Sequence, residues 1–382
     1  MIPKEFDEIR PYMSEELPQV FEELIADPEF QVAMGYAMQG IPFENIAAAM
    51  RNSKDNLEFQ KTLVYPFLQG VLKKLSSGLT VSCDNKENMA KALCISNHRD
   101  IIMDSAFLCI AFIETVNNTV EIAIGDNLLI RPWIKKLVRA NRSFIVQRSA
   151  SIREMLASSK RLSSYMHHAI TQRNQPIWLA QREGRAKDSN DRTQEGLIKM
   201  LSMYSSDDII DALKVLNIAP TTISYEYDPC DYLKAKEFQQ KRDNPEWKKA
   251  PQDDLINMKT GMFGYKGGIH YHIADCINNE IDAIDRSLGK NEKTAAVARI
   301  IDKHIHSNYK FWPINYYFYE LLTGDTRYAE KYTQDDKNNL DAYLQKQVAK
   351  VDLENRDDEF CRTKILEMYA NPVINYIKAT EE

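Results

Sequence analysis

Residues 94–104 are the most informative part of this sequence and read Cys94-Ile95-Ser96-Asn97-His98-Arg99-Asp100-Ile101-Ile102-Met103-Asp104. An apolar run that is typical of a strand ends at His98, and an apolar helical pattern follows it. Catalysis often uses such a place, because a base on a turn at a strand end is held by a rigid element on each side. The stretch therefore predicts a strand, a turn that carries His98, and a helix.

On both sides of this stretch, strand patterns alternate with helix patterns. Runs rich in β-branched and aromatic residues occur at 79–83, 92–96, 120–124, 143–147, 176–180, 218–225 and 268–274. Helical segments separate most of them, notably 102–116, 127–139, 151–172 and 194–215. This alternation predicts an α/β domain over residues 78–275, with a mixed, largely parallel sheet flanked by helices. Ligand sites in such a domain gather at the carboxyl ends of strands, where His98 lies.

Helical extensions are expected at both ends of the chain. Residues 1–77 show helical spacing, with Asp27 as an N-cap before Pro28 and with Pro66 as the position of a kink. Residues 276–382 are helical again and contain an aromatic segment at 309–317. We expect three regions, 1–77, 78–275 and 276–382.

Composition and charge reduce the number of protein classes to which the chain can belong. The chain has 382 residues, 44% hydrophobic and 27% charged, which is ordinary for a globular protein. Its net charge of −6 argues against nucleic acid as a partner. No apolar run reaches the roughly 18 residues of a spanning helix, and the N-terminus lacks the apolar core of an export signal. The six cysteines form no CxxC pair, which fits reduced thiols in a cytoplasmic protein.

The histidine in the first stretch has two candidate partners, Asp100 and Asp104. On a continuous helix neither carboxylate would face His98, because positions i+2 and i+6 lie about 160° and 120° away. A catalytic pair therefore requires His98 on a turn before the helix. The alternative interpretation, with about equal weight, makes Asp100 a helix N-cap and leaves His98 as a surface residue.

Two further segments could bind an anion. Nine basic residues and one acid lie between Arg131 and Arg161, and the strand in this region ends at Arg148. Such a surface suits phosphate groups or anionic lipid headgroups, although a solvated helix face is the alternative. Another strand runs into the turn Glu183-Gly184-Arg185, where glycine permits close approach of a ligand and Arg185 offers a fork for a phosphate. The alternative there is a turn with a surface arginine.

Four segments in this order resemble the glycerolipid acyltransferases. The first, His98 through Asp104, resembles the family's His and Asp block, but five residues rather than four separate the two. Asp104 is the preferred partner and Asp100 the reserve. The other three segments are Phe144 to Ser149 with Arg148, then Glu183-Gly184-Arg185, in which Arg182 could replace Glu183, and then Pro220 to Glu226.

The resemblance implies a reaction, a set of site residues and a set of partners. A fatty acyl group would pass from an acyl thioester, on acyl carrier protein or coenzyme A, to a hydroxyl of a glycerol phosphate or lysophospholipid. His98 would be the base and Asp104 its partner, with no metal and no other cofactor. Arg148 and Arg185 would hold the acceptor's phosphate, and Arg99, Glu183 and Gly184 would complete the substrate site. Such an enzyme of phospholipid biosynthesis would be peripheral to the inner face of the cell membrane, on an anionic surface.

Two other classes remain open. A metal-dependent phosphohydrolase would use His98 and its two aspartates together with His270 and His272, which alternate on one strand. A non-catalytic lipid-binding module would explain the unusual spacing of His98 and Asp104.

Overall fold

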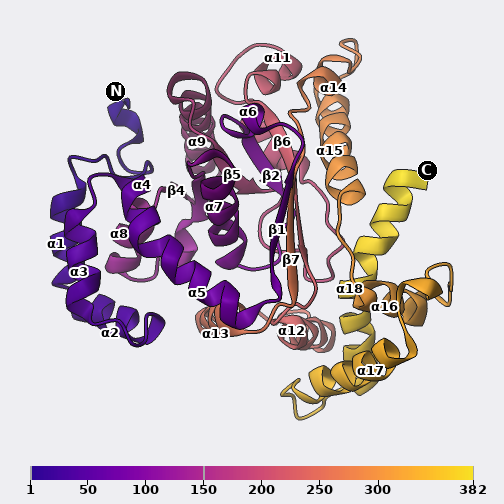
Figure 1. The fold of residues 1–382 in the computed structure, drawn as a ribbon. Helices are drawn as coiled ribbons and strands as arrows, with labels where there is room; N and C mark the ends of the chain where they lie inside the picture. The colour runs from indigo at the N-terminus through magenta and orange to yellow at the C-terminus, as the bar shows by residue number, and fades with distance from the viewer. Residues whose placement is uncertain (1, 149–150, 382) are drawn as a thin grey trace.

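The computed structural model of the chain describes residues 2–148 and 151–381 (Figure 1). At its centre lies a sheet whose seven strands, within these ranges, follow the order β1-β7-β6-β2-β5-β3-β4 (Figure 1). All neighbouring strands are parallel except β6 and β7, which are antiparallel. The predicted α/β class with a mixed, largely parallel sheet is therefore confirmed. The strands are β1 Gly78–Cys83, β2 Leu93–Ser96, β3 Glu121–Gly125, β4 Ser143–Val146, β5 Ile177–Ala180, β6 Ile218–Tyr225 and β7 Gly268–Ile273.

Helices cover both faces of this sheet. Successive side chains of a strand point to opposite faces, so a buried strand packs against helices on each side. In β2, Leu93 and Ile95 pack with residues of α9 and α15, whereas Cys94 packs with residues of α5 and α7. The helices around the sheet are α5 Tyr65–Leu75, α6 Lys86–Met89, α7 Met103–Val116, α8 Pro132–Ala140, α9 Ile152–Arg173, α10 Glu195–Leu201, α11 Ile209–Lys214, α12 Asp231–Asp243, α13 Pro251–Phe263, α14 Asn278–Asp282 and α15 Lys290–Ser307.

The N-terminal helices form their own small core, and Asp27 caps α2 as predicted. Its carboxylate accepts hydrogen bonds from the backbone N–H groups of Glu29 and Phe30. The irregularity expected at Pro66 is a π-helical turn over Gln60–Val64, directly before α5, since proline has no N–H to continue the α-helical bonds. This region contains the 3-10 turn Lys4–Phe6, α1 Leu17–Ile25, α2 Pro28–Ala37, α3 Phe43–Asn52 and α4 Asn56–Phe59.

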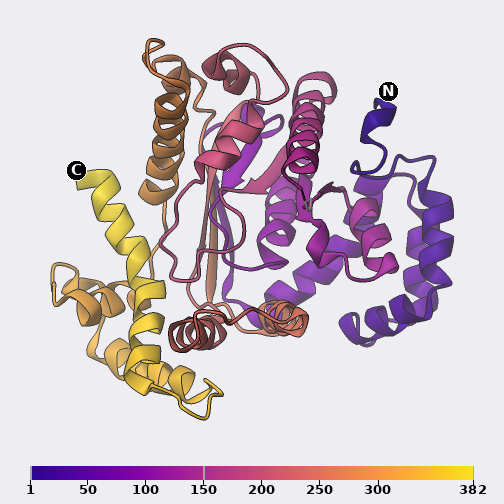
Figure 2. The same ribbon diagram turned by 180° about the vertical axis from the view of Figure 1, so that it is seen from behind.

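The C-terminal helices lie on the other side of the sheet from the N-terminal helices, as both views show (Figure 1, Figure 2). They pack around buried aromatic and aliphatic side chains such as Phe318, Leu344 and Tyr369. Their bounds are α16 Pro313–Thr323, the 3-10 turn Ala329–Lys331, α17 Gln334–Ala349 and α18 Asp358–Glu381.

Two helical predictions were wrong in their bounds. The segment 194–215 is not one helix but two, α10 and α11, because Asp208 starts a new helix by accepting from the N–H of Ile210. The segment predicted from 127 begins only at Pro132 and follows a 3-10 turn, Asp126–Leu128. Helices α12 and α13 had not been predicted, and both lie beside the functional residues described next.

Candidate active site

The candidate site lies where three parallel strands end. The loops after β2, β5 and β6 meet at one edge of the sheet, since these strands point the same way and β2 lies between the other two. The N–H of Gln181 donates to the carbonyl of Ser96 at 2.7 Å, which joins the loop after β5 to the end of β2. The edge predicted for ligand binding is therefore built from these loops.

His98 and Asp104 are in direct contact. Nδ1 of His98 lies 2.7 Å from Oδ2 of Asp104. The chain turns between β2 and α7, so that the carboxylate at the start of α7 folds back toward the histidine. The same oxygen of Asp104 accepts from the backbone N–H groups of Arg99 at 2.6 Å and Asp100 at 3.0 Å. The turn that a catalytic pair requires is present.

The hydrogen bonds also assign the histidine tautomer. Oδ2 of Asp104 already accepts from two N–H groups, so it is an acceptor toward His98 as well, and Nδ1 carries the proton. Nε2 is thereby left as the basic nitrogen, and it has no hydrogen-bond partner among the described residues. The Asp104 side chain is completely buried, whereas 14% of the His98 side chain is exposed. The histidine is therefore partly open to solvent, whereas its partner is closed off from it.

Asp100, the reserve partner, has a different role. Its Oδ1 accepts from the N–H groups of Ile102 and Met103, both at 2.9 Å, which caps the start of α7. Its other oxygen lies against the backbone of Gly261 in α13, where an added Cβ would be only 2.0 Å away. Burial, together with the negative charge of Asp104, raises the pKa of Asp100. The capping role expected in the alternative interpretation thus belongs to Asp100, while Asp104 holds His98.

Arg99 was predicted to bind substrate, but its guanidinium is already paired. It lies 2.7 Å from the buried carboxylate of Asp191, in the loop after β5, and only 7% of its side chain is exposed. The hydroxyl of Tyr309 donates to the same carboxylate at 2.6 Å. Burial opposes the charge of Arg99, but the surrounding oxygen atoms, those of Asp191 foremost, together raise the pKa of Arg99. The side chain therefore joins two loops of the site.

The structure brings Arg148 and Glu183 together at the rim of the site. Their side chains are 3.2 Å apart and well exposed, 49% and 70% respectively. An open groove beside them is lined by Asp126, Gln147, Arg148, Glu154, Ala157, Ser158 and Arg161. Ser149, the last residue of the second sequence block, lies outside the described residues.

Arg185 has a buried donor that is not committed to a partner among the described residues. Gly184 before it adopts a left-handed backbone conformation, with φ of 69°, that favours glycine. Nη2 of Arg185 donates to the side-chain oxygen of Asn257 in α13 at 3.1 Å. Nη1 is buried and has no hydrogen-bond partner among the described residues. A buried cationic donor without a partner is rare, and an anionic ligand would satisfy it.

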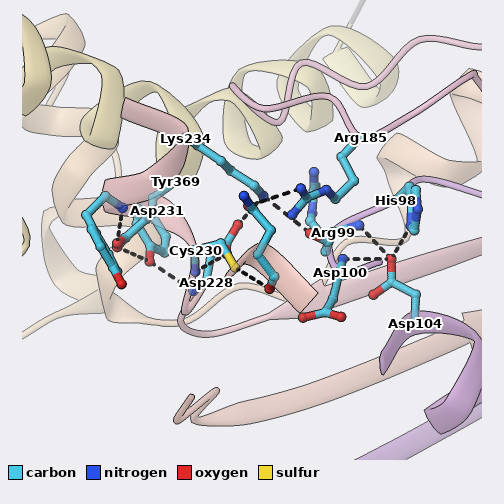
Figure 3. A network of polar contacts seen from close by, with 12 residues as sticks. His98, Arg99, Asp100, Asp104, Arg185, Asp228, Cys230, Asp231, Lys234 and Tyr369 are labelled. Carbon is cyan, nitrogen blue, oxygen red and sulfur yellow. Dashed lines mark hydrogen bonds and ion pairs between the residues drawn. The ribbon is translucent and has the colours of Figure 1, made fainter. Parts of the chain in front are cut away.

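A buried lysine that sequence reasoning missed supports the His98 turn. Lys234 in α12 donates to the backbone carbonyl of Arg99 at 3.3 Å and forms an ion pair with Asp228, and its side chain is 1% exposed. Burial alone would raise the pKa of Asp228, but the Lys234 ammonium holds that pKa below its usual value. Figure 3 shows this chain of contacts from His98 and Asp104 through Arg99 to Lys234.

The network continues into the C-terminal helices. The N–H of Asp228 donates to the hydroxyl of Tyr369 in α18, which in turn donates to Asp231, both at 3.0 Å (Figure 3). Asp231 also accepts from the hydroxyl of Tyr343 in α17 at 2.7 Å. Burial raises the pKa of Asp231 to about 6. The loop after β6 and the start of α12 are thereby fixed to α17 and α18.

The histidines of the alternative metal site lie elsewhere. His270 and His272 alternate with Tyr271, whose hydroxyl donates to the backbone carbonyl of Asp104 at 2.8 Å, so the histidines occupy the opposite face of β7. There they contact the hydroxyl of Ser82, at 3.2 Å and 2.8 Å. The described residues contain no group of three or more His, Cys, Asp or Glu side chains placed to hold a metal ion.

Most of the basic stretch from Arg131 to Arg161 is paired within the protein. Lys136 forms an ion pair with Glu23 at 2.8 Å, and Arg161 with Glu8 at 3.1 Å. The buried Arg139 donates to the backbone carbonyls of residues 10 and 7. No helix in the described part of the chain is long and apolar enough to cross a bilayer.

Part of the chain is similar to a known protein family. No relative was found among curated proteins. A similar solved structure is the 1-acyl-sn-glycerophosphate (LPA) acyltransferase PlsC from Thermotoga maritima, with 12% identity, 76% of this chain and 98% of that chain covered, and a TM-score of 0.34. Residues 80–203 match the family model described as Acyltransferase. This segment contains three of the four sequence blocks, with His98 and Asp104 in the first of them, and it supports the resemblance to acyltransferases; the fourth block, Pro220 to Glu226, lies outside it.

Proposed function

We propose that this protein transfers a fatty acyl group from an acyl thioester to a hydroxyl of a glycerol phosphate or a lysophospholipid. The observation that supports the proposal most is the 2.7 Å contact between His98 Nδ1 and Asp104 Oδ2, inside the segment that matches the acyltransferase family. Because Nδ1 donates to the carboxylate, the free Nε2 can accept a proton. An alcohol is too weak an acid to ionise beforehand at neutral pH, so a base must take its proton as attack proceeds.

In the proposed reaction the acceptor oxygen attacks the thioester carbonyl carbon while His98 Nε2 takes the hydroxyl proton. Asp104 stabilises the imidazolium that forms. The tetrahedral intermediate then collapses, the carbon–sulfur bond breaks, and the proton on Nε2 passes to the departing sulfur. The products are an ester and a free thiol, and His98 returns to its starting state.

Arg185 is the side chain best placed to hold the acceptor's phosphate. Its Nη1 is buried without a partner, whereas Arg99 is committed to Asp191 and Arg148 forms an ion pair with Glu183. A guanidinium fork suits a phosphate because it can donate two parallel hydrogen bonds. We therefore assign the phosphate to Arg185, with Arg148 at the rim as an additional contact that would require Glu183 to move.

A thiol-release assay tests this function. Purified protein is mixed with an acyl thioester of coenzyme A or of acyl carrier protein and with a panel of acceptors: glycerol 3-phosphate, a lysophosphatidic acid, a lysophospholipid with a larger headgroup, and an aminolipid. We expect thiol release with at least one phosphorylated acceptor and little release without an acceptor. Release only with the aminolipid would reject a phosphate site at Arg185, and no acceptor-dependent release with any member would reject the proposal.

A further inference from the structure

Helices α2 and α13 share one exposed apolar surface, which we call the α2–α13 face. The exposed side chains are Val32 (74%), Tyr36 (51%) and Ile41 (44%) in and after α2, Leu255 (46%) and Ile256 (49%) in α13, and Tyr265 (54%) after it. Both helices lie at the same end of the molecule (Figure 1, Figure 2). Tyr36 joins them, because its ring centroid lies 5.7 Å from that of Phe263 in α13. The two helices are therefore in contact on this side of the molecule, although they are far apart in the sequence.

Helix α13 separates this face from the candidate active site. Its inner side carries Asn257, which binds Arg185, and Gly261, which lies against Asp100. At about 100° per residue, Leu255, Ile256 and Lys259 fall within about 100° of one another on the outer side. A partner bound to the outer side of α13 would therefore be separated only by this helix from the residues proposed to hold the acceptor.

Unpaired lysines accompany the apolar side chains. The ammonium group of Lys259 lies 5.3 Å from the centroid of the Tyr36 ring, and Lys73 and Lys74 are exposed at the end of α5. The hydroxyl of Ser77, just after α5, contacts that of Tyr265 at 3.1 Å. None of these three lysines has a carboxylate within 4.0 Å among the described residues, in contrast to Lys136 and Arg161 of the basic stretch.

We propose that the α2–α13 face is the surface by which the protein docks on an anionic lipid bilayer. The proposal rests on the proposed function, because a lipid acceptor would enter the site from the membrane. Apolar side chains flanked by free lysines suit the boundary between acyl chains and anionic headgroups. A second copy of the chain suits the face less well, since a twofold contact would bring like surfaces, and their lysines, together. Docking places α13 between the bilayer and the site.

Co-sedimentation with vesicles tests the face directly. We compare vesicles of phosphatidylglycerol mixed with phosphatidylcholine against vesicles of phosphatidylcholine alone, at low salt. Two variants alter the face, the double variant Leu255→Glu with Ile256→Glu, and Lys259→Glu. Two matched controls are Val215→Glu, an exposed apolar residue (42%) at the end of α11 on the opposite end of the molecule, and Lys135→Glu, an exposed lysine of the basic stretch.

We expect the wild type to bind the anionic vesicles and the double variant to bind them at least about tenfold more weakly, while Val215→Glu binds like wild type. Lys259→Glu should weaken binding about tenfold and Lys135→Glu much less, because only Lys259 belongs to the face. Circular dichroism checks the fold of each variant. If the double variant does not fold, the comparison of the two lysine variants decides the proposal.

Several results would overturn the proposal. The wild type could fail to bind anionic vesicles, or the double variant could bind them as well as wild type. Equally, Lys135→Glu could weaken vesicle binding as much as Lys259→Glu does. A wild type that dimerises in solution through this face, with the double variant monomeric and still bound to vesicles, would assign the face to self-association.

Thiol release with a short-chain soluble acceptor separates the docking proposal from the proposed acyltransferase reaction. Its absence in a wild type that binds vesicles rejects the acyltransferase reaction alone, and its presence without vesicle binding rejects the docking face alone.

Discussion

Replacing the buried lysine behind the His98 turn should both destabilise the protein and slow its reaction. In Lys234→Met the carboxylate of Asp228 loses its ion-pair partner in a site where the two side chains are 1% and 13% exposed. Breaking a buried ion pair by removing one partner costs about 3–5 kcal/mol, because the remaining charge stays buried. We therefore expect the free energy of unfolding to fall by about 3–5 kcal/mol, measured by urea denaturation near neutral pH.

The same change removes a hydrogen bond to the carbonyl of Arg99, which belongs to the His98 turn. A loosened turn misplaces the base, so we expect kcat for thiol release to fall by about tenfold or more under conditions where the variant stays folded. KM for the acceptor should change little, since Lys234 touches no proposed substrate group.

A double-mutant cycle separates the ion pair from general damage to the helix. Asp228→Asn in the Lys234→Met background removes the unpaired charge, so the double variant should recover about 2 kcal/mol relative to Lys234→Met. Lys236→Met, on the same helix and without an ion pair among the described residues, serves as the control and should cost less than about 1 kcal/mol. A Lys234→Met variant that loses less than about 1 kcal/mol, or that keeps wild-type kcat, would refute this reasoning.

Three further predictions follow from the site. Asp104→Asn should lose most of its activity, whereas Asp100→Asn should retain more, because asparagine can still cap α7; the reverse ranking in thiol release would make Asp100 the partner of His98. Arg185→Gln should lower kcat/KM for a phosphorylated acceptor by about 10- to 100-fold, as expected for a lost charged hydrogen bond, and an unchanged value in steady-state kinetics would remove the phosphate from Arg185. Asp231 titrates at about 6 in the folded state, above its ordinary value, so the folded state binds its proton more tightly and stability is lost as pH rises through this range. Relative to Asp231→Asn, wild type should lose about 2 kcal/mol of unfolding free energy between pH 4 and pH 7, and parallel pH profiles in urea denaturation would contradict this.

The strands and the His98 turn could be predicted from the sequence because their signals are local. Each strand is a short run of β-branched and aromatic residues bounded by turn residues, and each appears within a residue or two of its predicted position. The spacing of His98 and Asp104 left their contact open, since only a chain reversal brings them together. The structure contains that reversal, and the cap formed by Asp100 stabilises it.

The partners of the site residues could not be predicted, because they come from distant parts of the chain. Asp191 lies 92 residues after Arg99, and the carbonyl of Arg99 bonds to Lys234, which is 135 residues away. Nothing near Lys234 marks it as buried, since α12 is rich in charged residues and resembles a solvated helix. The pairing of Arg99 with Asp191 could not be predicted either, because an arginine beside a candidate catalytic histidine looks the same in sequence whether it contacts a ligand or a buried carboxylate.

If His98 is the base in acyl transfer, replacing it with alanine must slow turnover while leaving the fold intact. The measurement is thiol release by purified His98→Ala and wild-type protein with the best acceptor of the panel, at equal concentration and with matched thermal unfolding curves. Loss of a general base lowers the rate by about 10²- to 10⁴-fold, so we predict a fall of that size in kcat. A folded His98→Ala variant that turns over at nearly the wild-type rate would contradict the account.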